Sequence, residues 1–352
     1  MRERPASQWK KHEPDSRAEA IQEEVKAIEL YPLIGHYKPE FLGEGAEHAV
    51  FEIAGHPNIV AKIRTGEGAQ IIRYNHENAM PPDMLDEKVK KDIERIMKED
   101  EGRFLLLKEY FPDSFLNERQ TVMQIPMTNE LAKTLFGQTI PAFERLDSYT
   151  IPMRVRFQER IPQGAQKPEA TDLKFRYLER RPISAGMYER LSGVLDGKIT
   201  GEEYFSSYEE GEKMIKTLRE NDGAKKALRD FVKRAIEYSE DTGEALDLAG
   251  QHNVILFDDK GTWRVILPDG MYPQKDLWSD AREVAEAYTT HHDLNSHDAN
   301  VLMNGMNYAR TINALADVVG IKERLFISRG TIPGTAMDLR YAILDAQSPL
   351  NG

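Results

Sequence analysis

The chain has 352 residues, of which 40 % are hydrophobic and 30 % are charged; this composition excludes a disordered polymer, and the length suits two lobes better than one compact core. Its net charge of −12 argues against a broad nucleic-acid-binding surface, and the absence of cysteine excludes disulfides, thiolate nucleophiles and cysteine metal sites. The N-terminus lacks the apolar stretch of a secretory signal. Since no apolar run approaches the ~20 residues of a membrane span, we expect a cytoplasmic protein that does not span a membrane.

The first half of the chain predicts a small β-sheet with a long helix. Residues 1–17 are polar and indicate an arm, and residues 17–30 have the spacing of a short helix. Between residues 39 and 65, two strand-like runs flank a Gly-x-Gly turn, and a third run follows another turn. This order predicts three consecutive antiparallel strands.

Further along, residues 85–111 predict a long helix, with Gly102 as a candidate kink and Pro112 just beyond its end. Residues 119–127 and 151–161 predict two more strands, whereas residues 128–150 carry no clear pattern.

The second half is mostly helical, with one hairpin. The predicted helices cover residues 184–194, 201–220, 224–239, 278–291 and 297–319. Between them, residues 254–257 and 262–267 flank a polar turn that ends at Gly261, which predicts a β-hairpin. Strands followed by helices indicate an α+β architecture with a small β-rich lobe and a larger helical one.

Four segments along the chain carry residues that are suited to binding phosphate or a metal ion. Gly43 and Gly45 lie in a turn between two strands, where a glycine backbone can approach a phosphate closely. Lys62 follows in the next strand, within an apolar run. The remaining two pieces are the loop from Asp247 to Asn253 and the Asp269-Gly270 pair after the hairpin, whose side-chain oxygens suit Mg²⁺.

In this order the chain resembles the protein-kinase-like superfamily, including its aminoglycoside- and choline-kinase-like branches. The resemblance covers roughly residues 40–270 and implies a two-lobed kinase-like fold that binds ATP and Mg²⁺. It implies boundaries at residues 1–37 for an N-terminal arm and helix, 38–162 for an N-lobe and 163–352 for a helical C-lobe. The activity implied is transfer of the γ-phosphate to a hydroxyl of an unidentified small molecule or protein.

The same resemblance implies roles for individual residues. Gly43 and Gly45 would cover the phosphates, and Lys62 would hold the α- and β-phosphates. Asp247 would position the acceptor hydroxyl and accept its proton, while Asn253 and Asp269 would bind Mg²⁺.

The resemblance also implies a hinge that meets adenine and a carboxylate that pairs with Lys62. The hinge is the segment from Gln158 to Ile161, with Glu159 and Ile161 as its contacts to the base. Glu101 is the expected partner of Lys62, with Glu94 and Glu77 as competitors.

Departures from the family pattern keep other functions open. Five residues separate Asp247 from Asn253 where the family has four, and no Ala-Pro-Glu signature follows Asp269. One alternative is therefore a pseudokinase that acts as a binding module or scaffold, and another is AMP transfer on the same fold.

A rival of a different class is a metal-dependent hydrolase. The histidine- and aspartate-bearing runs 290–293 and 296–298 resemble fragments of such a site. The same residue types are common as caps at a helix-to-helix turn, and capping is the reading that we favour.

Overall fold

The computed structural model describes residues 40–44, 48–53, 55–81, 84–126, 150–160, 171–172, 200–206, 209–248, 253–259, 261–268, 275–291 and 295–327. Within these ranges helices combine with antiparallel strands, which confirms the predicted α+β class. The chain divides into two compact units: Met1–Glu101 with Leu116–Pro162, and Gly102–Phe115 with Gln163–Gly352. The predicted arm, the helix at 17–30, the patternless stretch 128–149 and the helix at 184–194 lie outside the described residues.

The first unit is built on one antiparallel sheet with the strand order β1–β2–β3–β5–β4. The strands are β1 (Glu40–Glu44), β2 (His48–Glu52), β3 (Ile59–Arg64), β4 (Glu118–Pro126) and β5 (Thr150–Glu159). The predicted run of three consecutive antiparallel strands is confirmed, as are the two later strands.

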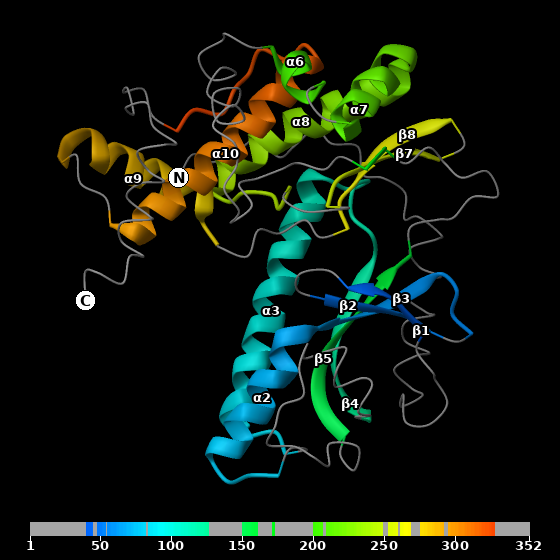
Figure 1. Cartoon of the computed structure of the whole chain (residues 1–352), viewed down its shortest axis with the longest axis vertical. Helices are drawn as coiled ribbons and strands as arrows, with labels where there is room; N and C mark the ends of the chain where they lie inside the picture. The colour runs from blue at the N-terminus through cyan, green and yellow to red at the C-terminus, as the bar shows by residue number, and fades with distance from the viewer. Residues whose placement is uncertain are drawn as a thin grey trace. The chain divides into compact units, whose positions relative to one another are not determined.

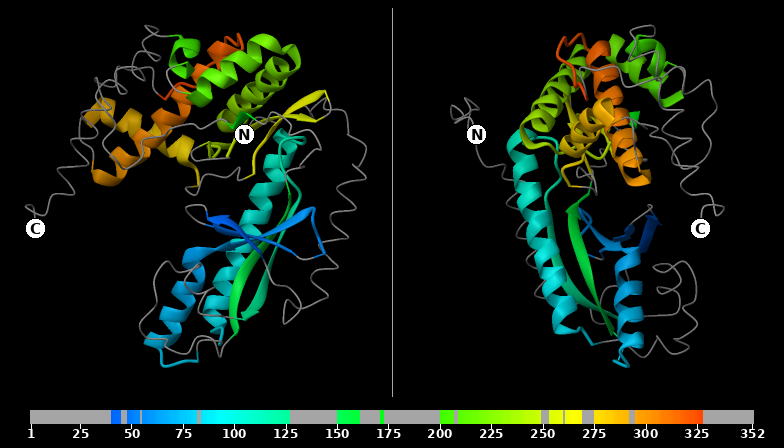
Figure 2. Two further views of the ribbon diagram at one scale, coloured as in Figure 1. Left: turned by 45° about the vertical axis from the view of Figure 1, so that its right-hand side comes forward. Right: turned by 90° about the vertical axis from the view of Figure 1, so that its left-hand side faces the viewer.

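Two helices of this unit lie on either side of β5, as the right-hand view of Figure 2 shows. They are α2 (Thr65–Glu77) and the first part of α3 (Glu87–Tyr110). Ile72 of α2 belongs to the buried cluster on one face of the sheet, together with Ala61 and Phe157. Asp100 of α3 binds Arg154 on the opposite face.

The helix α3 matches the predicted long helix, and it runs through Gly102 without a break. By contrast, α2 was not expected, because Gly66 and Gly68 in its first turn indicate a loop. Its burial explains why it forms: Ile71 and Ile72 are 4 % and 0 % exposed, so tertiary packing offsets the weak local propensity.

The second unit is largely helical (Figure 1). Its described elements are β6 (Thr171–Asp172), α6 (Gly201–Phe205), α7 (Glu209–Glu220), α8 (Asp222–Thr242), β7 (Ile255–Asp259), β8 (Thr262–Ile266), α9 (Leu277–His291) and α10 (Ser296–Val318). The predicted helices at 224–239, 278–291 and 297–319 and the hairpin at 254–267 are confirmed. The single helix predicted at 201–220 is wrong: α6 ends at its C-cap Ser206, and α7 begins at Glu209.

The core of this unit gathers around α8 and α10. The helix α10 packs against α6, α8 and α9, and α8 also packs against the β7–β8 hairpin. Gly305 allows α9 to approach closely, because a Cβ atom at this position would lie 2.3 Å from the Cβ of Ala281. At the end of α8, Gly243 takes the left-handed conformation with φ 76°, and this turns the chain toward Asp247.

Candidate functional site

Lys62 lies on the central strand β3 of the first unit and is 8 % exposed. Its neighbours Ala61 and Ile63 belong to the buried apolar cluster, so the alternation of a strand directs Lys62 to the opposite face. A lysine side chain that is this deeply buried needs polar or anionic surroundings for its charge.

The register of the sheet aligns Lys62 with Gly43, which was expected in the glycine turn but lies within strand β1. Val50 of β2 is the Cα partner of Gly43 on β1 and of Lys62 on β3. The pairing is irregular between Phe41 and Gly43. Gly43 and Lys62 therefore lie in one row across the sheet, two strands apart, or roughly 10 Å at the spacing of neighbouring strands. Gly45 lies outside the described residues.

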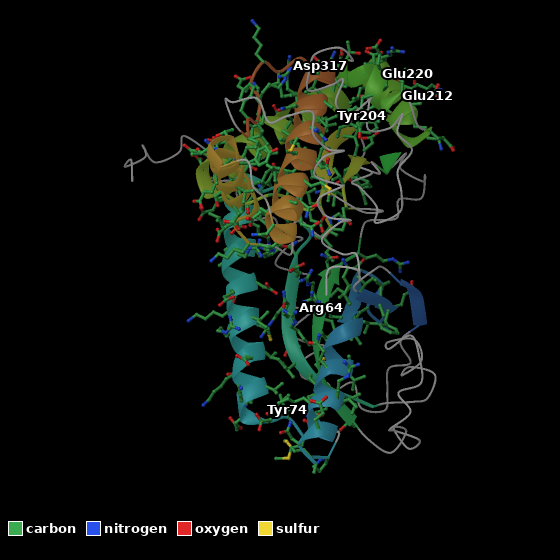
Figure 3. The ribbon with its side chains drawn as sticks, turned by 60° about the vertical axis from the view of Figure 1, so that its left-hand side comes forward. Arg64, Tyr74, Tyr204, Glu212, Glu220 and Asp317 are labelled. Atoms are coloured by element: carbon green, nitrogen blue, oxygen red, sulfur yellow. The ribbon has the colours of Figure 1, made fainter. Side chains whose placement is uncertain are left out.

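Four cations gather on the face that carries Lys62. Lys62 is the Cα partner of Arg156 on β5, and the same register continued by two residues sets Arg64 opposite Arg154. We call Lys62, Arg64, Arg154 and Arg156 the cation block; Figure 3 labels Arg64, which ends β3. The arginines on β5 were not singled out from the sequence, although their alternation with apolar residues in MRVRF indicates a polar face.

Two carboxylates bind to this block. Asp100 of α3 accepts a hydrogen bond from Arg154 at 2.8 Å, and the side chain of Arg154 is 7 % exposed. Glu118 of β4 lies 3.7 Å from Nε of Arg156 and accepts a hydrogen bond from Gln158 at 3.0 Å. The face is thus a buried network of charges rather than an apolar surface.

The carboxylates that were considered as partners of Lys62 lie on exposed positions. Glu94 and Glu101 are exposed on α3, and Glu77 is exposed at the end of α2. The α3 carboxylate that reaches the sheet is Asp100, which pairs with Arg154. The pairing of Lys62 with Glu101 stays a prediction.

The expected hinge is hydrogen-bonded within its own unit. Glu159, which is 7 % exposed, donates its backbone N–H to the carbonyl of Asn117 at 2.8 Å, and its carboxylate accepts from Nδ2 of Asn117 at 3.1 Å. Arg160 donates its backbone N–H to the carbonyl of Asn58 at 2.7 Å. Ile161 lies outside the described residues.

In the second unit, Asp247 sits at the centre of a tight turn. The N–H of Leu248 donates to the carbonyl of Leu246 at 3.0 Å, which closes a three-residue turn around Asp247. Leu246 and Leu248 are fully buried, whereas Asp247 is half-buried. The two leucines anchor the turn in the core, and Asp247 lies between them at a more exposed position.

A buried carboxylate holds the chain just before this turn. Glu244 is 5 % exposed, and its Oε2 atom accepts hydrogen bonds from Nε and Nη2 of Arg103 at 3.1 and 3.0 Å. The hydroxyl of Tyr238 donates to the same oxygen at 2.8 Å. Burial and the neighbouring Glu244 carboxylate both raise the pKa of Tyr238, so this phenol stays a donor.

Tyr308 stabilises the turn around Asp247 through hydrogen bonds. Its hydroxyl forms a hydrogen bond with Ser239 at 2.8 Å and another with the backbone of Leu246. Burial raises the pKa of Tyr308 to about 12, against the opposing effect of these two hydrogen bonds. The segment that presents Asp247 is therefore fixed by polar contacts at Glu244 and at Leu246.

The candidate metal ligands lie around the β7–β8 hairpin. Asn253 is half-buried and immediately precedes the fully buried Val254. Ile255 pairs with Ile266, so Asn253 and Pro268 leave the hairpin at the same end. Asp269, which follows Pro268 in the chain, lies outside the described residues.

Of the two histidine- and aspartate-bearing runs, 290–293 precedes α10 in the chain and 296–298 forms the first turn of α10. Asn295 caps this helix, because its side chain accepts from the N–H of Asp298 at 2.9 Å and donates to the carboxylate of Asp298 at 2.7 Å. His292 and Asp293 lie outside the described residues. Within the ranges that are described, no group of three or more histidine or acidic side chains is arranged to hold a metal ion.

No family model matches the chain, and neither a curated protein nor a solved structure matches it. Among the helices that the structure describes, none combines the length and apolar character needed to cross a bilayer.

Proposed function

We propose that the protein is an ATP- and Mg²⁺-dependent phosphotransferase with a kinase-like fold, which moves the γ-phosphate to a hydroxyl of a small molecule or a protein. The observation that carries the proposal is the row formed by Gly43, Val50 and Lys62, which aligns a glycine of β1 with a buried lysine of β3. Glycine backbone and an ammonium group are complementary to a phosphate chain. The lack of cysteine favours the reducing cytoplasm as the place of the reaction.

The proposed roles follow from the chemistry of each side chain. Lys62 binds phosphate oxygens, and its burial strengthens this electrostatic interaction. Asp247 positions the acceptor hydroxyl and accepts its proton, a role that needs a carboxylate held in one place. The contacts of Glu244 and Leu246 supply that rigidity.

The side chains present also fit a divalent cation. Asn253 and Asp269 carry the hard oxygen donors that Mg²⁺ prefers, and Asn253 is half-buried beside the hairpin. When bound, Mg²⁺ neutralises charge on the transferred phosphate. The chemistry of these two side chains is therefore consistent with the proposal.

The decisive experiment compares Asp247→Asn with the wild type for transfer of labelled γ-phosphate from ATP, with Mg²⁺ and a mixture of hydroxyl-bearing acceptors. We expect a decrease in kcat of roughly 10²- to 10⁴-fold, the range of general-base catalysis. Asp241→Asn is the matched control, because Asp241 is an exposed carboxylate on α8 that binds Tyr110. Unchanged transfer by the Asp247 variant would contradict the proposal.

The rival function is a binding module without turnover. The exposed position of Glu101 and the five-residue spacing between Asp247 and Asn253 favour it. A Mg²⁺-dependent rise of Tm with ATP that Asp269→Ala abolishes supports the nucleotide site. No rise in either protein supports the binding module, and a product that carries AMP supports nucleotidyl transfer.

A further inference from the structure

The turn around Asp247 is closed by a hydrogen bond between near neighbours in the chain. The N–H of Leu248 donates to the carbonyl of Leu246, two residues earlier, at 3.0 Å. A bond over so short a span fixes the shape of the turn but not its place in the second unit. The place of the Asp247 carboxylate therefore depends on contacts between the neighbours of Asp247 and the helices of that unit.

Tyr308 makes such a contact from the middle of α10. The residue is 1 % exposed, and its ring packs edge-on against Trp278 of α9, with the ring centroids 6.2 Å apart. Its hydroxyl shares a hydrogen bond of 2.8 Å with the fully buried Ser239 of α8. The helices α8 and α10 pack against each other (Figure 1). The phenol oxygen is therefore held in place by residues of three helices.

The same oxygen is bonded to the main chain beside Asp247. Its partner there is the backbone of Leu246, which shares a peptide bond with Asp247. A shift of the Leu246 backbone is therefore passed directly to Asp247. The carboxylate of Glu244 anchors the chain three positions before Asp247, so its contacts with Arg103 and Tyr238 restrain Asp247 less directly.

We propose that Tyr308 is a positioning residue for the reaction, whose hydroxyl holds the backbone of Leu246 so that the carboxylate of Asp247 meets the acceptor hydroxyl. The inference rests on the proposed function, in which Asp247 orients that hydroxyl and accepts its proton, and it adds the residue that places Asp247. Tyr308 acts through the main chain and does not touch the substrate. A misplacement of about 1 Å can slow a reaction by ~10²-fold, so loss of this contact lowers kcat.

The test compares Tyr308→Phe with the wild type for transfer of labelled γ-phosphate from ATP to the same mixture of hydroxyl-bearing acceptors, with kcat and the KM for ATP measured separately. The substitution deletes one oxygen and keeps the ring that packs on Trp278. We expect kcat to fall by roughly ten- to hundredfold, whereas the KM for ATP stays within about twofold, because Lys62 is unaltered. The assays are run well below the Tm of each variant, so that all the protein is folded.

Two further variants separate positioning from a general loss of structure. Tyr204→Phe is the matched control, because it deletes the same oxygen from a phenol that is 7 % exposed on α6 of the same unit; kcat should stay within about twofold. Ser239→Ala removes the other hydrogen bond of Tyr308 and should lower Tm more than kcat. Hydrogen exchange at the amide of Leu248 should become about fivefold faster in Tyr308→Phe and stay unchanged in Tyr204→Phe.

The outcomes distinguish this inference from the proposed function. A lower kcat in Tyr308→Phe alone, at an unchanged KM for ATP, supports the positioning role. If the wild type transfers phosphate and Tyr308→Phe keeps its kcat, or loses no more than Tyr204→Phe, the positioning role is overturned and the phosphotransferase stands. If the wild type transfers none, the proposed function fails and the role of Tyr308 in the reaction fails with it.

Discussion

Arg103 of α3 donates two hydrogen bonds to one oxygen of Glu244, a residue three positions before Asp247. The side chains of Arg103 and Glu244 are 15 % and 7 % exposed, so the pair is shielded from water. Tyr238 adds a third donor to the same oxygen. The Glu244 carboxylate thereby links the segment before Asp247 to the helices α3 and α8.

Replacing Arg103 by methionine leaves the buried Glu244 carboxylate with its Tyr238 hydrogen bond and without the guanidinium. We expect the free energy of unfolding to fall by about 3 kcal/mol, as for other broken buried pairs. Urea unfolding followed by circular dichroism measures this loss. Hydrogen exchange at the amides of Leu246 and Leu248 should increase in the same variant, because the turn loses its anchor.

The control for this change is Arg95→Met on the same helix. Arg95 pairs with Glu99 at 2.9 Å, but both side chains are about 60 % exposed, so the loss should stay below ~0.5 kcal/mol. Equal destabilisation by the two variants would refute the structural importance of the Arg103 pair.

The phenol of Tyr308 makes the free energy of unfolding depend on pH in the alkaline range. Burial raises its pKa from 10.0 to about 12 in the folded protein. The folded state therefore retains a proton that the unfolded chain releases, and the resulting stabilisation is complete below pH 10 and is lost as the pH rises toward 12. The slope is about 1.4 kcal/mol per pH unit for one group.

Tyr308→Phe removes this slope together with the hydrogen bonds to Ser239 and Leu246. The variant should be less stable than the wild type near pH 8, and the difference should shrink between pH 10 and pH 12. Unfolding in urea at a series of pH values measures the two curves. A difference that stays constant with pH would show that the phenol of Tyr308 does not carry the raised pKa.

The order of elements could be predicted where local pattern and burial agree. The strands β1 to β5 and the hairpin follow runs of alternating or apolar residues between turn residues, and the structure reproduces them. The helix α2 could not be predicted, because two glycines in its first turn weaken the helical signal and only the burial of Ile71 and Ile72 compensates. The break between α6 and α7 was missed because the helical pattern continues across it.

The residues of the candidate site could likewise be predicted only in part. Lys62 could be singled out because an ammonium group within an apolar strand is unusual, and its burial agrees with that reasoning. The pairing of Arg103 with Glu244 joins positions 141 residues apart, and no local pattern encodes a contact at that separation. Asp100 was overlooked in favour of its neighbour Glu101, because the rotation of α3 against the sheet follows from packing.

The ion pair between Asp100 and Arg154 offers a test of the buried charge network on the sheet. Asp100→Asn preserves the shape of the side chain but removes the charge that faces Arg154, whose side chain is 7 % exposed. We expect a loss of about 2–3 kcal/mol, toward the lower end for a broken buried pair because Asp100 is partly exposed. Urea unfolding at low and high salt measures it, and the loss should persist in salt because buried pairs are weakly screened.

The adjacent residue provides the control. Glu99→Gln removes the carboxylate from an exposed pair with Arg95 and should change the free energy of unfolding by less than ~0.5 kcal/mol. If Asp100→Asn is as mild as Glu99→Gln, the pair with Arg154 contributes no more than a surface ion pair.

Two helical glycines should respond in opposite directions to the same substitution. A Cβ atom at Gly102 in α3 would meet nothing within 4 Å, so Gly102→Ala should stabilise the protein by about 0.5–1 kcal/mol through helix propensity. A Cβ atom at Gly305 in α10 would lie 2.3 Å from the Cβ of Ala281. Gly305→Ala should therefore force α9 and α10 apart and destabilise by about 1–3 kcal/mol. Thermal and urea unfolding of both variants measure the two signs, and a stabilised Gly305→Ala protein would contradict the close packing of α9 on α10.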